Sequence, residues 1–200
     1  MGTRGAVGFI KDGVHKVTYN HSDSYPDGLG NQVIDYIHDH TIEEMNAHFN
    51  NIKLVDEDKL PSDEQIAACE KNDTINLDVS NQSKTDWYCL LRNVHGQLAE
   101  YGKLGFMIDS REFLFDGLFC EYAYIINLTT NELEFYSGFK KEIPHGRYGK
   151  DAPIHEVVKE RLEGNGKQEY YVGLETTTSL ELIKKETKEY VFTHAFPEEK

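Results

Sequence analysis

With 200 residues, of which 12% are aromatic, the chain is too rich in core-forming side chains to be disordered and long enough for one sizeable core. Its formal net charge of −14 disfavours binding to nucleic-acid polymers or anionic membranes, but a small anionic ligand remains compatible with one locally positive site. The three cysteines form no Cys-x-x-Cys pair and no stretch is apolar over a membrane-spanning length, so we expect a cytoplasmic protein with reduced thiols.

The chain is expected to open with a β-hairpin. Residues 4–10 are apolar or glycine on both faces, as in an interior strand that is covered on both sides. Lys11-Asp12-Gly13 supplies the turn, and residues 14–19 return as the partner strand. Gly5 and Gly8 leave room on the first strand for the close approach of a ligand or of another backbone.

Helices are predicted through the middle of the chain. After a polar loop at residues 20–28, one helix should begin near Leu29. The capping-box patterns Thr41-Ile-Glu-Glu44 and Ser62-Asp-Glu-Gln65 predict two more, and residues 73–83 read as a loop. The strongest helical periodicity follows, over residues 85–98, with room for a kink at Gly96. One face of this helix would carry Trp87, Leu90, Leu91, Val94 and Leu98.

The C-terminal part is expected to complete the sheet. Residues 119–138 read as a second hairpin that turns at Thr129-Thr-Asn-Glu132, and residues 140–167, with their prolines and glycines, as an excursion away from the core. A strand at 170–175 and a closing helix from 179 to about 190 follow. The sequence therefore predicts a single α+β domain over residues 1–200, with a central, mainly antiparallel sheet built on the two hairpins and with packed helices.

The densest polar cluster is the Tyr19–Gly30 block, which reads Tyr-Asn-His-Ser-Asp-Ser-Tyr-Pro-Asp-Gly-Leu-Gly. It joins a strand to a helix, so the amides of Gly28 and Gly30 could receive an anion at the helix N-terminus. A purely structural reading is also open, in which Asp27 caps the helix and the remaining polar side chains hold the turn.

Three stretches of the sequence resemble an uncharacterised family that is widespread in phages and bacteria and has relatives in fungi. They are Gly2-Thr3-Arg4, the Tyr-Asn-x-x-Asp-Ser-Tyr-Pro-x-Gly-Leu-Gly pattern of residues 19–30, and Glu121-Tyr122-Ala123-Tyr124. The resemblance is close over the first forty residues and loose over 119–138, and it does not extend to 40–118 or 140–167. It implies that the Tyr19–Gly30 block is a functional site rather than a structural turn.

The first hypothesis that follows is a phage-type protein that binds a small nucleotide-derived signal of antiviral defence, either sequestering or cleaving it. Arg4 would pair with a phosphate and Tyr19 and Tyr25 would stack on a base, with His21 and Asp23 as the acid–base pair if cleavage occurs. Tyr122 and Tyr124 would add an aromatic wall, although a plain core face also explains their alternation. The ligand-binding residues would be Thr3, Arg4, Tyr19, Asn20, Asp23, Ser24, Tyr25, Gly28, Gly30, Tyr122 and Tyr124.

Two other functions remain open. The acidic surface suits a module that binds and inhibits a host protein. Thr3 would be the nucleophile of an amino-terminal nucleophile hydrolase if Met1 and Gly2 were removed. No motif predicts a cofactor, and His38 and His40 diverge on a helix, which makes a metal site there unfavourable.

Overall fold

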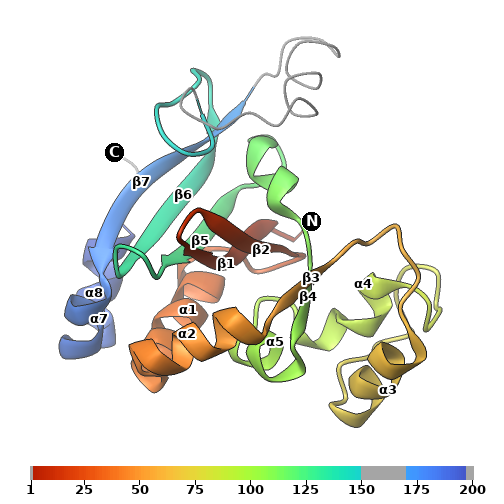
Figure 1. Cartoon of the computed structure of the whole chain (residues 1–200). Coiled ribbons are helices and arrows are strands. Elements are labelled where there is room, and N and C mark those ends of the chain that lie inside the picture. Colours follow the sequence, from red (N-terminus) through yellow and green to blue (C-terminus); the bar gives the residue numbers. More distant parts are fainter. Residues whose placement is uncertain (1, 150–169, 197–200) are drawn as a thin grey trace.

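The computed structural model describes residues 2–149 and 170–196, and its centre is a mixed five-stranded sheet (Figure 1). The strands, in spatial order, are β2 (Val14–Asn20), β1 (Gly5–Lys11), β5 (Tyr122–Asn127), β6 (Glu132–Lys140) and β7 (Tyr171–Ser179). Within this sheet only the β1–β5 pairing is parallel, so the prediction of a mainly antiparallel α+β sheet built on two hairpins is confirmed.

Helices cover one face of this sheet. A separate, parallel two-stranded sheet, which the sequence analysis missed, is formed by β3 (Lys53–Val55) and β4 (Phe106–Ile108). The helices are α1 (Asn31–Asp39), α2 (Ile42–Asn51), α3 (Asp63–Lys71), α4 (Trp87–Leu90), α5 (Leu98–Leu104), α7 (Leu180–Lys185) and α8 (Lys188–Ala195). In Figure 1, α1, α2 and α5 lie beneath the sheet, while α3 and α4 extend to one side of it.

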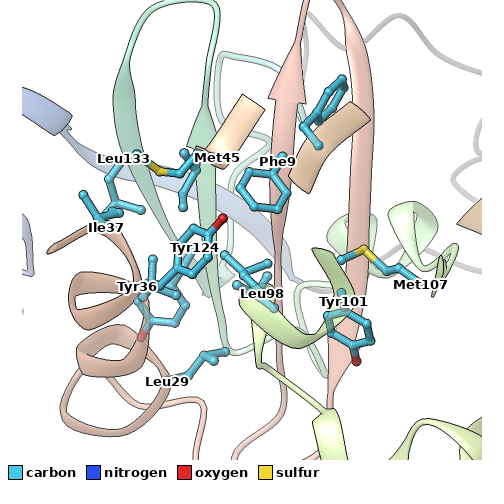
Figure 2. Close-up of a cluster of buried hydrophobic side chains, with 14 of the residues drawn as sticks. Phe9, Leu29, Tyr36, Ile37, Met45, Leu98, Tyr101, Met107, Tyr124 and Leu133 are labelled. Carbon is cyan, nitrogen blue, oxygen red and sulfur yellow. The ribbon is translucent and has the colours of Figure 1, made fainter. Parts of the chain in front are cut away.

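Strand β1 is interior and buried on both faces, as predicted. Val7 and Phe9 point into the main core under the helices, and Ala6 and Ile10 point into a smaller core on the opposite face. Figure 2 shows how the main core is closed: Phe9 and Tyr124 of the sheet meet side chains of α1, α2 and α5, among them Tyr36. We call the two sides of the sheet the helix face and the second face.

The helix ends are closed by local chemistry. Both predicted capping boxes are present, at Thr41 with Glu44 and at Ser62 with Gln65, where side chain and backbone satisfy each other's hydrogen bonds. At the C-terminal end of α1, Lys184 Nζ donates hydrogen bonds to backbone carbonyl oxygens, among them that of Ile37 at 2.9 Å. These contacts fix the helices that carry the core.

The predicted helix over residues 85–98 is wrong. Helix α4 ends at Leu90, a 3₁₀ turn spans Arg92–Val94, and α5 begins only at Leu98. The backbone of His95 is extended, and Gly96 has a φ of +79°, a left-handed conformation that glycine adopts without steric cost and that ends a helix. The helical periodicity is real but belongs to three short pieces.

One further prediction is corrected at the C-terminal end. The closing helix is divided, because the backbone of Glu186 is extended between α7 and α8. Within the expected excursion, residues 141–143 are exposed, whereas Tyr148 is buried against the second face and Arg147 forms an ion pair with Glu134 of β6. The rest of the expected excursion, from residue 150 to 167, lies outside the described residues.

All three cysteines are free and buried, as the sequence predicts. No helix in the described part of the chain is long and apolar enough to cross a membrane.

Candidate functional site

Four aromatic side chains form a closed ring of edge-to-face contacts at the β2 edge of the sheet. They are Tyr19 at the end of β2, His21 just after it, Tyr88 in α4, and His95 between the 3₁₀ turn and α5. Going round the ring, the centroid distances are 5.9 Å from Tyr19 to His21, 5.7 Å from His21 to Tyr88, 5.1 Å from Tyr88 to His95, and 6.3 Å from His95 to Tyr19. We call this group the aromatic tetrad.

Burial and neighbouring positive charges favour the neutral form of the two imidazoles of the tetrad. The hydroxyl of Tyr19 lies 3.0 Å from Nδ1 of His21. Burial, followed by the charges of Arg92 and His21, lowers the pKa of His95 to about 4, and burial with nearby arginines also lowers the pKa of His21. Nδ1 of His95 is buried and has no hydrogen-bond partner among the described residues. The tetrad thus contains a buried polar atom that the described residues leave without a hydrogen bond.

Two arginines near the tetrad have no ion-pair partner among the described residues. The guanidinium of Arg92 lies 5.9 Å from the ring centre of Tyr88, and that of Arg4 lies 5.1 Å from the ring centre of Phe119. Both charges depress the pKa of His21, so both lie within electrostatic reach of its imidazole. Within residues 2–149 and 170–196, Arg111 and Arg147 have ion-pair partners, whereas Arg4 and Arg92 have none. The tetrad therefore has two cations near it, on a chain whose net charge is −14.

A cavity of about 290 Å³ opens beside the tetrad. It is lined by Thr18, Tyr19, Glu57, Tyr88, His95, Ile108, Asp109, Ser110 and Phe113. The volume is at the lower end of the roughly 300–1,000 Å³ of small-molecule sites, which suits one ring system rather than two. Tyr19 and Phe113, whose ring centres are 5.0 Å apart, form an aromatic corner of this cavity.

The two carboxylates of the cavity differ in their surroundings. Asp109 accepts two hydrogen bonds from Arg111, at 2.8 and 2.6 Å, so its charge is compensated. Partial burial, together with the charges of Asp86 and Asp58, raises the pKa of Glu57, which has no partner among the described side chains. Glu57 is thus an acceptor at the cavity without a donor.

The Tyr19–Gly30 block is mainly a packed turn. Asn20 Nδ2 donates to the Ser22 carbonyl at 2.6 Å and to Ser24 Oγ at 2.8 Å, and both Asn20 and Ser24 are buried. The amide of Ser24 donates to the carbonyl of Thr3, and Tyr124 donates its hydroxyl proton to the carbonyl of Ser24 at 2.9 Å. These contacts account for Thr3, Asn20, Ser24 and Tyr124 as structural residues.

The exposed members of the block do not join the cavity. Asp23 is exposed and has a φ of +55°, and its carbonyl accepts the amide of Leu29. Tyr25 is 45% exposed, with its ring 6.3 Å from that of Tyr122. The prediction that Asp23 and Tyr25 line one cavity with Arg4 and Tyr19 is therefore wrong.

The expected anion cradle at Gly28 and Gly30 is also wrong. The chain forms a π-helical turn over Pro26–Gly30, in which the amides of both glycines donate to the carbonyl of Tyr25. Their small size has another cause, because a Cβ on Gly28 would lie 2.2 Å from the carbonyl of Asp23 and one on Gly30 would lie 2.9 Å from Phe196. Both glycines permit close packing.

The predicted aromatic wall is split between the two faces of the sheet. Tyr124 pairs with Val7 and points into the main core, and Tyr122 packs against the same core. Tyr19 pairs with Ala6, which faces the second side. A flat ligand cannot touch Tyr19 and Tyr124 together, and the core explanation for the 122–126 alternation is correct.

Of the predicted residues, the structure brings together Arg4, Tyr19 and His21. Sequence reasoning missed their partners on the 85–98 segment, which was read for its apolar face alone. Tyr88, Arg92 and His95 stand at i, i+4 and i+7, the spacing of one polar–aromatic helix face beside that apolar stripe. That spacing was the available signal. No sequence signal pointed to Glu57 or Phe113, because only the tertiary fold brings them to the cavity.

No three His, Cys, Asp or Glu side chains in the described ranges are grouped so that they could hold a metal ion. Thr3 is only 4% exposed, so the geometry offers no support for its use as an amino-terminal nucleophile. Comparison with known proteins found no matching family model, no matching curated protein and no matching solved structure.

Proposed function

We propose that the chain binds a small anionic, nucleotide-like molecule at the aromatic tetrad and its cavity. The observation that carries the proposal is the pair of arginines, Arg4 and Arg92, that flank the tetrad without an acidic partner among the described residues. On a chain with 35 acidic and 21 basic side chains, an arginine has many carboxylates available, so two unpaired ones at one site favour an anion as the missing partner.

The residues present suit the two halves of a nucleotide. Guanidinium groups bind phosphate through charge and paired N–H donors. Tyr19, Tyr88 and Phe113 offer ring faces and edges for a base beside them. The neutral imidazoles of His21 and His95 can each donate and accept a hydrogen bond, which suits a sugar or phosphate oxygen between base and arginine.

Whether the ligand is held or cleaved depends on the imidazoles. A neutral histidine is a competent general base, and the charges of both arginines act on His21. In a cleavage reaction His95, which lies on the other side of Tyr88, would be the second imidazole of the site. Sequestration needs neither histidine to exchange a proton, and it is the simpler form of the proposal.

The biological role rests on the resemblance of the Tyr19–Gly30 block to a phage family. On that basis we propose that the ligand is a nucleotide-derived signal of antiviral defence and that the protein acts in the host cytoplasm. The acidic module that inhibits a host protein is the alternative, and it predicts no effect of small molecules on stability but a partner affinity that falls steeply with salt.

The test is ligand-induced thermal stabilisation with a panel of nucleoside monophosphates, cyclic dinucleotides and ADP-ribose. A ligand at a hundredfold excess over its Kd adds about 2.7 kcal/mol, which raises Tm by several degrees in a chain of this size. Arg4→Ala and Arg92→Ala should each remove the shift while leaving the Tm of the free protein nearly unchanged.

Lys185→Ala is the matched control, because it removes one positive charge at the exposed end of α7, on another part of the fold. It should keep the full shift. A panel that gives no shift in the unmodified chain would reject nucleotide binding, and a shift that survives both arginine variants would reject this site.

A further inference from the structure

Charges of both signs act on the cavity and the tetrad. The guanidinium of Arg92 lies 5.9 Å from the ring centre of Tyr88, which lines the cavity, and the charges of Arg4 and Arg92 both act on Tyr19 and His21. Glu57 lines the cavity and lies near the charges of Asp58 and Asp86, so this part of the wall is acidic. A ligand that carries both a negatively charged group and hydrogen-bond donors matches these two features.

Glu57 is the carboxylate of the cavity that could accept those donors, since its side chain is exposed at the cavity. Asp109 also lines the cavity, but the guanidinium of Arg111 occupies its two oxygens. Glu57 has no hydrogen bond or ion pair to any residue of the described ranges, and Tyr19, which lines the same cavity, is electrostatically coupled to it. An ionised carboxylate only accepts, and its two oxygens match two adjacent N–H groups on one edge of a flat ring.

We infer that the cavity selects a guanine-type base, whose adjacent N–H donors Glu57 accepts while the phosphate points to Arg4 and Arg92. This inference rests on the proposed function and names the substrate class of the same site. The aromatic corner of Tyr19 and Phe113 accommodates one ring system, and the volume leaves no room for a second base. A cyclic dinucleotide would bind through one of its bases only.

Adenine fits this edge less well for a simple reason. Its Watson–Crick edge places a ring-nitrogen acceptor beside a single amino donor, so one oxygen of Glu57 would face an acceptor without a proton between them. Hypoxanthine keeps the ring N–H but lacks the amino group of guanine. The three monophosphates GMP, IMP and AMP therefore differ in the hydrogen-bond donors on this edge of the base, while their phosphate and sugar are the same.

The test is isothermal titration calorimetry of these three monophosphates with the unmodified chain, Glu57→Gln and Asp58→Asn. We expect GMP to bind at least about tenfold more tightly than AMP, the ratio that one good two-point base contact gives, with IMP between them. In Glu57→Gln the ratio should fall to about threefold or less, because the amide replaces one acceptor with a donor. Asp58→Asn removes a neighbouring charge that does not line the cavity, and it should keep the full ratio.

The outcomes separate this inference from the proposed function. If AMP binds as tightly as GMP, or if the preference survives Glu57→Gln, guanine selection is overturned while nucleotide binding stands. If the preference is lost equally in Asp58→Asn, it reflects overall charge and the contact with Glu57 is overturned. If none of the three monophosphates binds, and the wider nucleotide panel also gives no thermal shift, both proposals fail together.

Discussion

Nη2 of Arg147 lies 2.7 Å from Oε1 of Glu134, and the side chain of Glu134 is only 5% exposed. The same carboxylate accepts hydrogen bonds from Asn127 and Tyr136, so it is buried with three donors on the second face of the sheet. Arg147 comes from the segment after β6, and the pair anchors that segment to the strand it follows. A buried charge of this kind stabilises the fold only while its partner is present.

Replacing Arg147 by Met should therefore lower the free energy of unfolding by about 3 kcal/mol, since it leaves the charge of Glu134 buried with neutral donors alone. Denaturant titration measures the loss. Adding Glu134→Gln to Arg147→Met should recover more than half of it, because the uncompensated charge is then gone. If Arg147→Met alone costs less than about 0.5 kcal/mol, the pair is a surface interaction.

Acid should destabilise the chain through His95. Its pKa is about 4 in the folded protein and 6.5 in the reference state, so the unfolded chain takes up a proton first as the pH falls. The stability from the neutral imidazole is complete above about pH 6.5 and is lost progressively down to about pH 4, by an amount on the order of 3 kcal/mol. The lowered pKa values of His15 and His21 act in the same direction.

Chemical denaturation at a series of pH values measures this slope. His95→Gln should flatten the slope between pH 6.5 and 4 by up to about 1.4 kcal/mol per pH unit, the effect of one proton. The matched control is His194→Gln, because His194 is exposed, and it should leave the slope unchanged. A slope that is equally steep without His95 would show that this imidazole is not buried neutral.

The cysteine thiols should be unreactive in the folded protein. Cys69, Cys89 and Cys120 are free and buried, and burial raises the pKa of the Cys69 and Cys120 thiols, which keeps both protonated at neutral pH. Thermal unfolding with and without reductant should give the same Tm, and a thiol reagent should react only as the chain unfolds. Rapid labelling of the native protein would show an exposed thiolate instead.

The sequence predicted those features that depend on local pattern. The two hairpins, both capping boxes and the interior position of β1 follow from side-chain alternation, turn residues and caps, and these are what the structure contains. The pairing of β3 with β4 was not predictable in this way, because two three-residue strands more than fifty positions apart carry no periodic signal. The break after Leu90 was missed because the apolar stripe continues through it.

The same difference between local and long-range features holds for the site residues. Arg4, Tyr19 and His21 were found because they lie on or beside one short hairpin. Asp23 and Tyr25 were placed with them only by closeness in sequence, and the positive φ of Asp23 turns the chain away. The positions of Tyr88 and His95 in the tetrad depend on a helix break and on a left-handed glycine, and the apolar stripe does not predict either feature.

Gly96 is the residue on which the site's assembly depends most directly. Its φ is +79°, and a Cβ there would lie 2.9 Å from Leu29 Cδ1 and 3.0 Å from Asn20 Oδ1. Gly96→Ala should thus combine backbone strain of about 1–2 kcal/mol with an overpacking cost of about 1–3 kcal/mol. It should also displace the neighbouring His95, and with it the ring contacts to Tyr19 and Tyr88.

Gly13→Ala separates these two costs. Gly13 has nearly the same φ, +77°, but a Cβ there would meet nothing within 4 Å, so its substitution should cost the backbone strain alone. We expect Gly96→Ala to be less stable than Gly13→Ala in denaturant titration, and to lose the ligand-induced rise in Tm that Gly13→Ala keeps. Equal costs in the two variants would mean that Leu29 and Asn20 move aside freely. The tight contact at Gly96 would then not be what holds His95 against the tetrad, and the position of this imidazole would depend on the α4 side of the site.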